Sequence, residues 1–229
     1  MSPSIRQVRI WDLPTRIFHW SLVICIVGAF ITVKAGVLWM DWHMRFGLAT
    51  IALICFRVIW GLMGPRYARF SHFLKGPRAI VRYLADRSSH AAGHNPLGGW
   101  SVVAMLAIFG FQAFSGLFTT DDILASGPLA HLNDDWTATL TGLHKGGEWI
   151  LVAMVALHVL AVLWYQWVVR QNLVGPMIHG DVLHDASSSI EPASDNTALR
   201  VLALALITLL AWGAWWLSTL GAGAVTDFM

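Results

Sequence analysis

The chain has 229 residues, of which 56% are hydrophobic and only 12% are charged, and its formal net charge is +2. About a quarter of the residues in an ordinary soluble domain are charged, so this composition excludes disordered, fibrous and ordinary soluble proteins. It indicates a protein embedded in a lipid bilayer, and no nucleic-acid partner is expected. Two cysteines, Cys25 and Cys55, are too few for a disulfide scaffold, and no CxxC or CxxCH motif occurs.

Five segments are long and apolar enough to be predicted as transmembrane helices, since about 20 apolar residues cross the hydrocarbon core as a helix. In chain order they cover residues 17–38, 43–63, 98–118, 144–168 and 199–220. The first is not expected to be a cleaved signal peptide, because a basic segment precedes it, no A-x-A site closes it and a histidine lies inside it. The prediction is therefore an all-α integral membrane protein.

The charges of the connecting segments predict the orientation, because short segments rich in Lys and Arg remain in the cytoplasm. Three arginines precede the first helix, and six Lys and Arg residues lie between the second and third helices. The third connection carries four aspartates before Lys145, which suits the outer side. The amino terminus is thus placed in the cytoplasm and the carboxyl terminus in the periplasm. Within the second connection, the stretch GPRAIVRYLADR is compatible with a short helix that lies on the membrane surface, and a basic loop that lies against anionic lipid is the favoured alternative.

The polar stretch SSSIEPASDN separates the first four predicted helices from the fifth. It predicts a flexible cytoplasmic linker over residues 171–198. The expected organisation is a four-helix membrane domain over residues 1–170, this linker, and a fifth transmembrane helix with a periplasmic tail over residues 199–229.

Four of the ten histidines fall inside predicted transmembrane helices, where ionisable groups are costly and usually mark a function. These four are His19, His43, His144 and His158. The other six, in predicted loops, are His72, His90, His94, His131, His179 and His184. His144 and His158 are fourteen residues apart, close to four helical turns, so they share one helix face about 21 Å apart along the axis.

The topology pairs the four histidines by depth in the membrane. His19 begins a helix that runs outward, and His158 lies late in a helix that runs inward, so both are placed near the inner side. His43 and His144 are both placed near the outer side. A single membrane histidine is often only a hydrogen-bonded packing residue, but two pairs about 20 Å apart suit two bis-histidine haems.

Zinc and copper sites usually contain three or four protein ligands, often including cysteine or a carboxylate. No such ligand accompanies the two histidine pairs, except for Glu148 near His144. A low-spin haem needs only two axial imidazoles. Its propionates need cationic partners near the membrane surfaces, for which simple snorkelling to the lipid headgroups is an equal alternative. The candidates are Arg16 and Arg57 on the inner side and Arg45 and Lys145 on the outer side.

The stretches WDLPTRIFHW, DWHMRFG and LHKGGEWILVAMVALHV resemble the bacterial cytochrome b561 and Ni-Fe hydrogenase b-type cytochrome family, over roughly residues 6 to 180. The resemblance implies a four-helix transmembrane bundle that holds two b-type haems. It implies His19 and His158 as ligands of the inner haem iron and His43 and His144 as ligands of the outer haem iron. The linker and the fifth helix depart from the four-helix members and favour a subunit bound to a partner.

The expected function is electron transfer across the bacterial inner membrane between a redox partner and the quinone pool, as the electron-transfer subunit of an oxidoreductase. The partner is a cytochrome c, a dehydrogenase or a hydrogenase subunit, and homo-oligomers are an open possibility. One alternative is a stand-alone enzyme that oxidises superoxide or another small donor and reduces quinone. Another is a transporter in which the histidines carry protons or non-haem metal ions.

Overall fold

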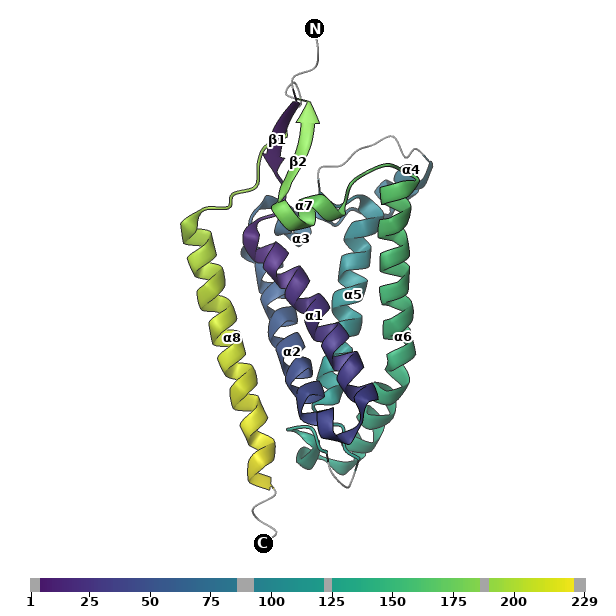
Figure 1. Ribbon diagram of the computed structural model, residues 1–229, viewed down its shortest axis with the longest axis vertical. Coiled ribbons are helices and arrows are strands. Elements are labelled where there is room, and N and C mark those ends of the chain that lie inside the picture. The colour runs from purple at the N-terminus through teal and green to yellow at the C-terminus, as the bar shows by residue number, and fades with distance from the viewer. Residues whose placement is uncertain (1–4, 86–92, 122–124, 186–189, 225–229) are drawn as a thin grey trace. The chain divides into compact units, whose positions relative to one another are not determined.

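The computed structural model describes residues 5–85, 93–121, 125–185 and 190–224. Within these residues five helices are long and apolar enough to cross a membrane. They are α1 (Leu13–Ala35), α2 (Met40–Met63), α5 (Pro96–Gly116), α6 (Asp134–Trp167) and α8 (Thr197–Ala224) (Figure 1). All five predicted membrane segments are therefore helical. Helix α6 begins at Asp134, ten residues before the predicted fourth segment, because the polar stretch before the apolar run is also helical.

Shorter elements connect the long helices. They are β1 (Ile5–Arg9), α3 (Phe70–Phe73), α4 (Pro77–Ala85), α7 (Val174–His179), β2 (Asp181–Asp185), and 3-10 helices at Val37–Trp39, Arg66–Ala68 and Ala130–Leu132. Part of the basic connection forms the short helix α4 rather than a loop, with Val81 and Leu84 exposed and Tyr83 buried. Exposed apolar side chains of this kind suit a helix at a membrane surface.

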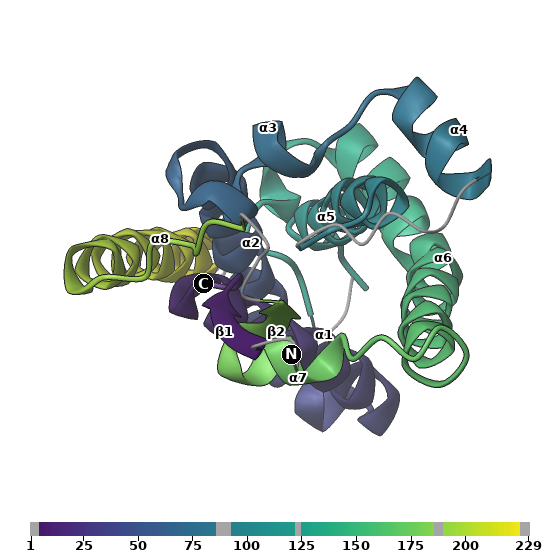
Figure 2. The ribbon, with the colours of Figure 1, turned by 90° about the horizontal axis from the view of Figure 1, so that it is seen from above.

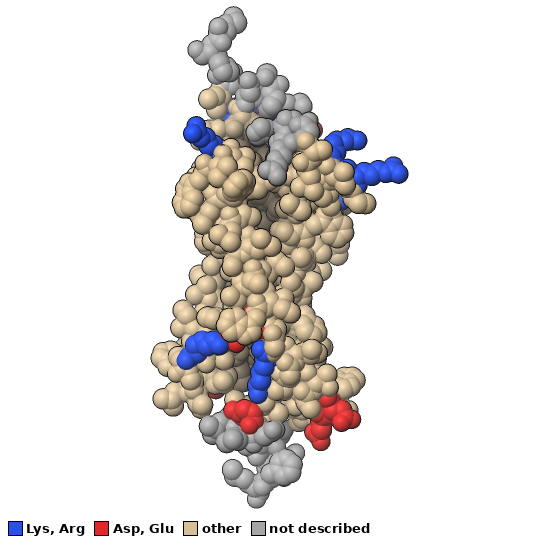
Figure 3. Space-filling model, turned by 90° about the vertical axis from the view of Figure 1, so that its right-hand side faces the viewer, with Lys and Arg blue, Asp and Glu red and all other residues tan. Residues whose placement is uncertain are grey.

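The surface of the long helices is apolar. Leu38, Trp149 and Trp167 are 95%, 73% and 71% exposed, and most of the face shown in Figure 3 belongs to uncharged residues. A soluble monomer rarely exposes contiguous apolar surface on this scale. Lipid is the environment in which such a surface is favourable, and the chain is a multi-pass membrane protein.

The chain divides into two compact units, each of which draws on three stretches of sequence. The first unit comprises Met1–Phe18, Arg57–Met105 and Leu157–Leu204, and the second comprises His19–Phe56, Leu106–Ala156 and Ala205–Met229. The unit that contains the amino terminus is called the N-terminal unit below, and the other is called the pocket unit.

A two-stranded sheet fastens the beginning of the chain to the segment that precedes α8. β1 and β2 pair antiparallel, with Arg9 opposite Asp181 and Ile5 opposite Asp185, and they lie beside α7 (Figure 2). The Arg9 guanidinium forms ion pairs with Asp181 and with Asp195, the latter at 2.9 Å. These carboxylates raise the pKa of Arg9, as expected for a cation stabilised by neighbouring anions.

The prediction that residues 171–198 form a flexible linker is wrong for most of this segment. It contains α7 and β2, and Ala193 donates a backbone hydrogen bond of 2.7 Å to the carbonyl of Arg9. Ala193 is also buried in a cluster with Val8, Ile10, Trp11 and Tyr67. Apolar residues between the polar ones pack against the cluster and hold the segment in place. A prediction from the average polarity of the segment does not detect these single residues. Residues 186–189 lie outside the described part of the chain.

Asp12 fixes the start of α1. Its carboxylate accepts hydrogen bonds from the backbone N–H and the hydroxyl of Thr15, at 3.0 and 2.8 Å, and from the indole N–H of Trp60 at 3.0 Å. The first two bonds cap the amino end of the helix, and the third joins α1 to α2 within the N-terminal unit. Asp12 and Trp60 are each only 1% exposed. If one of them were removed, water could not take over its hydrogen bond to the other.

We expect Asp12→Ala to lower the free energy of unfolding by about 2–3 kcal/mol, because it removes a helix cap and leaves the Trp60 indole N–H without its acceptor. Denaturant unfolding of the detergent-solubilised protein, followed by tryptophan fluorescence, measures the change. Asp134→Ala is the matched control, since Asp134 also lies in the first turn of a helix but is exposed. Equal effects of the two substitutions would contradict the capping role.

Candidate functional site

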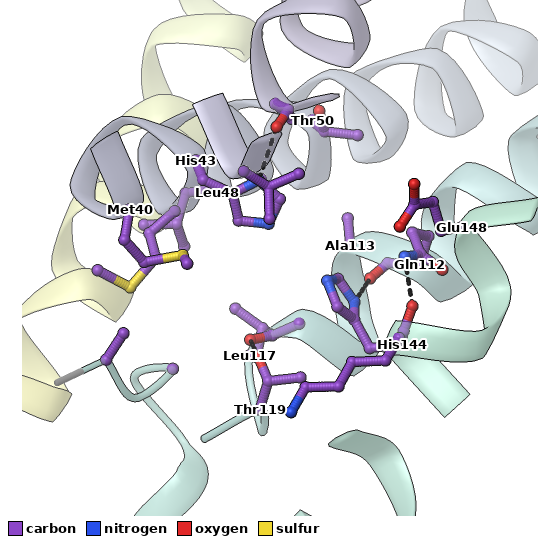
Figure 4. Close-up of a pocket in the computed structure, with 18 of the residues that line it drawn as sticks. Met40, His43, Leu48, Thr50, Gln112, Ala113, Leu117, Thr119, His144 and Glu148 are labelled. Carbon is purple, nitrogen blue, oxygen red and sulfur yellow. Dashed lines mark hydrogen bonds between the residues drawn. The ribbon is translucent and has the colours of Figure 1, made fainter. Parts of the chain in front are cut away.

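Two of the four predicted histidine ligands face each other in the pocket unit. His43 lies in the first turn of α2, and His144 lies in the third turn of α6. Their ring centroids are 6.1 Å apart and the ring planes are nearly perpendicular, at 82°. Figure 4 shows the two imidazoles approaching from different helices. This pair was predicted from the topology, and the structure brings it together.

Backbone carbonyl groups orient both imidazoles. Nδ1 of His43 lies 2.8 Å from the carbonyl oxygen of Ala29, and Nδ1 of His144 lies 2.8 Å from that of Gln112. A carbonyl oxygen only accepts hydrogen bonds, so Nδ1 carries the proton in both rings. The lone pair then resides on Nε2 of each ring, which is the arrangement of a histidine prepared to bind a metal.

Close approaches between helices make these hydrogen bonds possible. A Cβ atom on Gly28 of α1 would lie 2.6 Å from the Phe46 ring of α2, so glycine at this position leaves the space that the Phe46 ring occupies, next to the residue that His43 contacts. A Cβ atom on Gly116 of α5 would lie 2.9 Å from Cε1 of His144. Glycine at this position therefore leaves the space that the His144 ring occupies.

The histidines line a cavity of about 280 Å³. Residues of α1, α2, α5 and α6 and of the segment that follows α5 surround it. Most of the lining is apolar, including Ile26, Val33, Leu48, Phe109 and Leu151. The cavity surrounds the two histidines with mostly apolar side chains and leaves space between helices for a bound group.

The charged groups at this cavity do not form a conventional metal cluster. Glu148 pairs with Lys34 at 2.6 Å, and Lys145 lines the cavity. Among the described residues no group of three or more His, Cys, Asp and Glu side chains is placed to hold a metal ion. The histidine donors here are therefore two imidazoles, and the carboxylate of Glu148 beside them is paired with Lys34.

The other two histidine candidates belong to different units, and their pairing remains a prediction. His19 lies in the pocket unit and His158 in the N-terminal unit. His158 lies close enough to His94 for their charges to interact. Burial, together with Arg57 and His158, lowers the pKa of His94 to about 3, so His94 is neutral at physiological pH.

The sequence interpretation missed His94 because it treats this histidine as an ordinary loop residue. The next residue, Asn95, caps α5 by accepting the Gly98 backbone N–H at 2.7 Å, and Pro96 is the first residue of the helix. An Asn-Pro pair before an apolar run is a signal of a helix start. This signal places His94 directly before the start of a transmembrane helix. In the structure, the His94 ring packs against Trp11 and Phe73, and the ring centroids are 4.7 Å apart in both pairs.

The four predicted propionate partners have different surroundings. Arg16 donates to the backbone carbonyl of Ile178 at 2.6 Å, and the Arg45 guanidinium lies over the Trp42 ring at 5.1 Å. Lys145 lines the cavity between the histidines. Arg57 is only 2% exposed. Of the outer candidates, Lys145 is thus the one placed at the cavity.

The remaining predicted loop histidines lie outside the cavity. His72 packs against Tyr67, His131 is in a 3-10 helix, His179 ends α7 and His184 is in β2. Burial and the neighbouring Lys75, Arg66 and Arg69 lower the pKa of His72. His90 lies outside the described residues. Cys25 is buried and Cys55 is exposed, and both are free thiols.

Comparison with known proteins adds independent evidence. The chain is similar to the probable Ni/Fe-hydrogenase B-type cytochrome subunit of Cupriavidus necator, with 23% identity over 77% of this chain and 87% of the relative. It is similar to the probable Ni/Fe-hydrogenase 1 B-type cytochrome subunit of Escherichia coli K12, with 22% identity over 78% of this chain and 92% of the relative. No solved structure matches the chain. The family model described as prokaryotic cytochrome b561 matches residues 10–180, and the chain therefore belongs to this family.

Proposed function

We propose that this protein holds two b-type haems and transfers electrons across the bacterial inner membrane between a redox partner and the quinone pool. Membership in a family of b-type cytochromes implies haem b and electron transfer in a membrane. We propose the number of haems, the quinone and the redox partner in addition. The observation that supports them most is the opposed pair of His43 and His144, whose Nδ1 atoms are both bound to backbone carbonyls.

The separation of these rings fits axial ligation of one haem iron. An imidazole nitrogen lies about 2 Å from the metal that it binds, and the ring centroid lies about 1 Å further out. Two imidazoles on opposite faces of a haem therefore have centroids about 6 Å apart, close to the 6.1 Å between His43 and His144. The free Nε2 atoms supply the two donors that a low-spin haem requires.

Small residues line the cavity at positions where the planar haem would need space. Gly47 lies one turn after His43 on α2 and lines the cavity, and a Cβ atom there would have no heavy atom within 4 Å. Ala29, Ala113 and Gly116 line the same space. Lys145 is the residue at this cavity that would hold a propionate of the outer haem, and Arg45 is the second candidate.

The second haem is proposed at His19 and His158. α6 carries His158 fourteen residues after His144, so the two histidines project from one face of one continuous helix. Arg16 and Arg57 would hold the propionates of this inner haem. The two haems would then provide two steps for an electron that crosses the bilayer.

The bound haem would supply one-electron chemistry, and the residues of the chain would set its conditions. His43 and His144 would hold the iron through Nε2. The carbonyls of Ala29 and Gln112 would orient the rings and make the ligand nitrogens more basic. The apolar lining would exclude water, which raises the influence of each nearby charge on the reduction potential.

A hydrogenase is the partner that the comparisons favour, because the two relatives are named as hydrogenase cytochrome subunits. The proposed orientation places the basic segments in the cytoplasm, with the amino terminus inside and the carboxyl terminus outside. α8 adds a helix beyond residues 10–180, the span of the family match. It would provide a membrane surface for such a partner, as expected of a subunit rather than a stand-alone enzyme.

Substitution of the four histidines tests the proposed pairs. We expect His43→Ala and His144→Ala each to remove the same haem, and His19→Ala and His158→Ala each to remove the other, because each iron loses one of two axial donors. A pyridine-haemochrome assay counts haem per chain, and redox-titrated absorption spectra identify which haem is lost. Loss of one and the same haem in all four variants would show that the pairing is wrong.

Filling the space beside His43 tests the location of the outer haem. We expect Gly47→Leu to lower the haem content from two toward one per chain, because the side chain would project into the cavity. Gly142→Leu is the matched control, since a Cβ atom there also has open space but Gly142 does not line the cavity. Equal haem contents in the two variants, measured by the same assay, would place the haem elsewhere.

Electron transfer to quinone is tested with the purified protein. We expect dithionite-reduced protein to be reoxidised by a short-chain ubiquinone or menaquinone analogue, with both haems returning to the oxidised absorption spectrum in stopped-flow measurements. A His144→Ala variant that retains the inner haem serves as a comparison. A colourless preparation without a Soret band would contradict the haem proposal and favour an ion-carrying role for the histidines. Reduced haems that no quinone analogue oxidises would contradict the quinone proposal alone.

A further inference from the structure

Arg57 is a buried cation on a membrane helix of the N-terminal unit. It is 2% exposed, and its Nη1 atom is buried without a hydrogen-bond partner among the described residues. The guanidinium lies over the rings of Phe70 and Phe73, at 5.0 and 5.8 Å from their centroids. Gly61, one turn further along α2, leaves room for the Phe70 ring. Aromatic faces stabilise a cation only partly, so Arg57 lacks the anion that a buried charge normally requires.

The carboxylate that acts on Arg57 electrostatically is already occupied. The negative charge of Asp12 attracts this cation through space, but its two oxygens accept hydrogen bonds from Thr15 and Trp60. No ion pair of Arg57 is found within the part of the chain that the structure describes. The donor on Arg57 is therefore available to an anion from outside the polypeptide.

His94 supplies a second donor beside Arg57. Its Nδ1 atom is buried and has no hydrogen-bond partner among the described residues. Phe73 contacts both groups, since its ring lies 4.7 Å from the His94 ring and under the Arg57 guanidinium. Arg57 and His158 are the two residues whose charges act on His94. Arg57 Nη1, and His94 Nδ1 in the tautomer that carries the proton there, are thus two open donors near the proposed ligand of the inner haem.

The spacing along α2 puts Arg57 on the haem side of the helix. Arg57 follows His43 by fourteen residues, the same interval that separates His158 from His144 on α6. Fourteen residues are close to four helical turns, so Arg57 projects from the face of α2 that carries His43, about 21 Å further along the axis.

We propose that Arg57 and His94 together bind one propionate carboxylate of the inner haem. The inference rests on the proposed function, because it requires a haem at His158. A carboxylate supplies the negative charge that Arg57 lacks and accepts hydrogen bonds from both nitrogens. A neutral quinone carbonyl would satisfy the donors but would leave the buried charge without a counter-ion. His94 is then a haem-binding residue in addition to the four axial histidines.

Haem with esterified propionates provides the test. Apoprotein from haem-deficient cells is titrated in detergent with haemin and with haemin dimethyl ester, and binding is followed by Soret absorbance. We expect wild type to bind two haemins. We expect Arg57→Gln and His94→Leu each to weaken one of the two sites by about 10-fold or more for haemin. With the ester, wild type should already be weakened at that site, and the variants should bind it as wild type does.

Matched variants separate loss of a donor from loss of packing. Arg57→Lys and His94→Asn keep a nitrogen donor and should recover most of the haemin affinity. Arg66→Gln is the control, because Arg66 belongs to the same unit but pairs at the surface with Glu191 at 2.6 Å; it should bind haemin as wild type does. Wild-type protein that binds haemin and its dimethyl ester equally well at both sites would overturn the inference without any variant.

The remaining outcomes are equally decisive. Variants that weaken haemin and the ester by the same factor would show that Arg57 and His94 only support packing, and the inference would fail. Unchanged haemin binding with loss of quinone-analogue binding would assign the two residues to quinone and would also overturn it. Wild-type protein that binds a single haemin, with His158→Ala without effect, would overturn the two-haem function itself. Two haemins with no effect of esterification would overturn the propionate inference alone.

Discussion

The hydrogen bond from an imidazole Nδ1–H to a backbone carbonyl is the interaction on which the pocket depends. It fixes the tautomer of His43 and of His144 and leaves Nε2 of each ring as a donor toward the cavity. A free histidine on a membrane helix has several rotamers and two tautomers, and only one combination presents Nε2 in the right place. The carbonyls of Ala29 and Gln112 select that combination before any ligand arrives.

Glycines beside these hydrogen bonds leave space for the neighbouring aromatic rings. Gly28 allows the Phe46 ring to lie against α1, and Gly116 allows the His144 ring to lie against α5. In a bilayer, close packing between helices is a main source of association, because lipid offers no hydrophobic driving force between them. The residues that bring the helices together therefore also position the ligands.

Buried charge follows a second constraint. Partly buried Arg9 and Asp181 and buried Asp195 satisfy one another beside the two-stranded sheet. Buried Asp12 is satisfied by Thr15 and Trp60. Arg57 and His94 have no such arrangement within the described chain. Two neighbouring nitrogen atoms that stay open favour a ligand there, since each open donor is costly in a medium of low polarity.

The sequence by itself determined the membrane class and the five helices, and it predicted that His43 and His144 form a pair. Hydropathy decides the first two because every backbone polar group must be satisfied inside a helix in lipid, and the helical period places His144 and His158 on one face. Sequence reading failed at residues 171–198, where scattered contacts from Ala193 and β2 to β1 order a polar segment. Such contacts join residues far apart in the chain, and local composition does not encode them.

Only the tertiary structure decided which nitrogen of each pocket histidine is free, because the carbonyls that bind Nδ1 belong to other helices. It also decided that His94 is a buried group beside Arg57 rather than a loop residue, since aromatic rings from Trp11 and Phe73 enclose it. The sequence thus identifies the ionisable residues whose presence in membrane helices is costly and needs a functional reason. Packing between distant segments determines the direction in which each of them presents its donor.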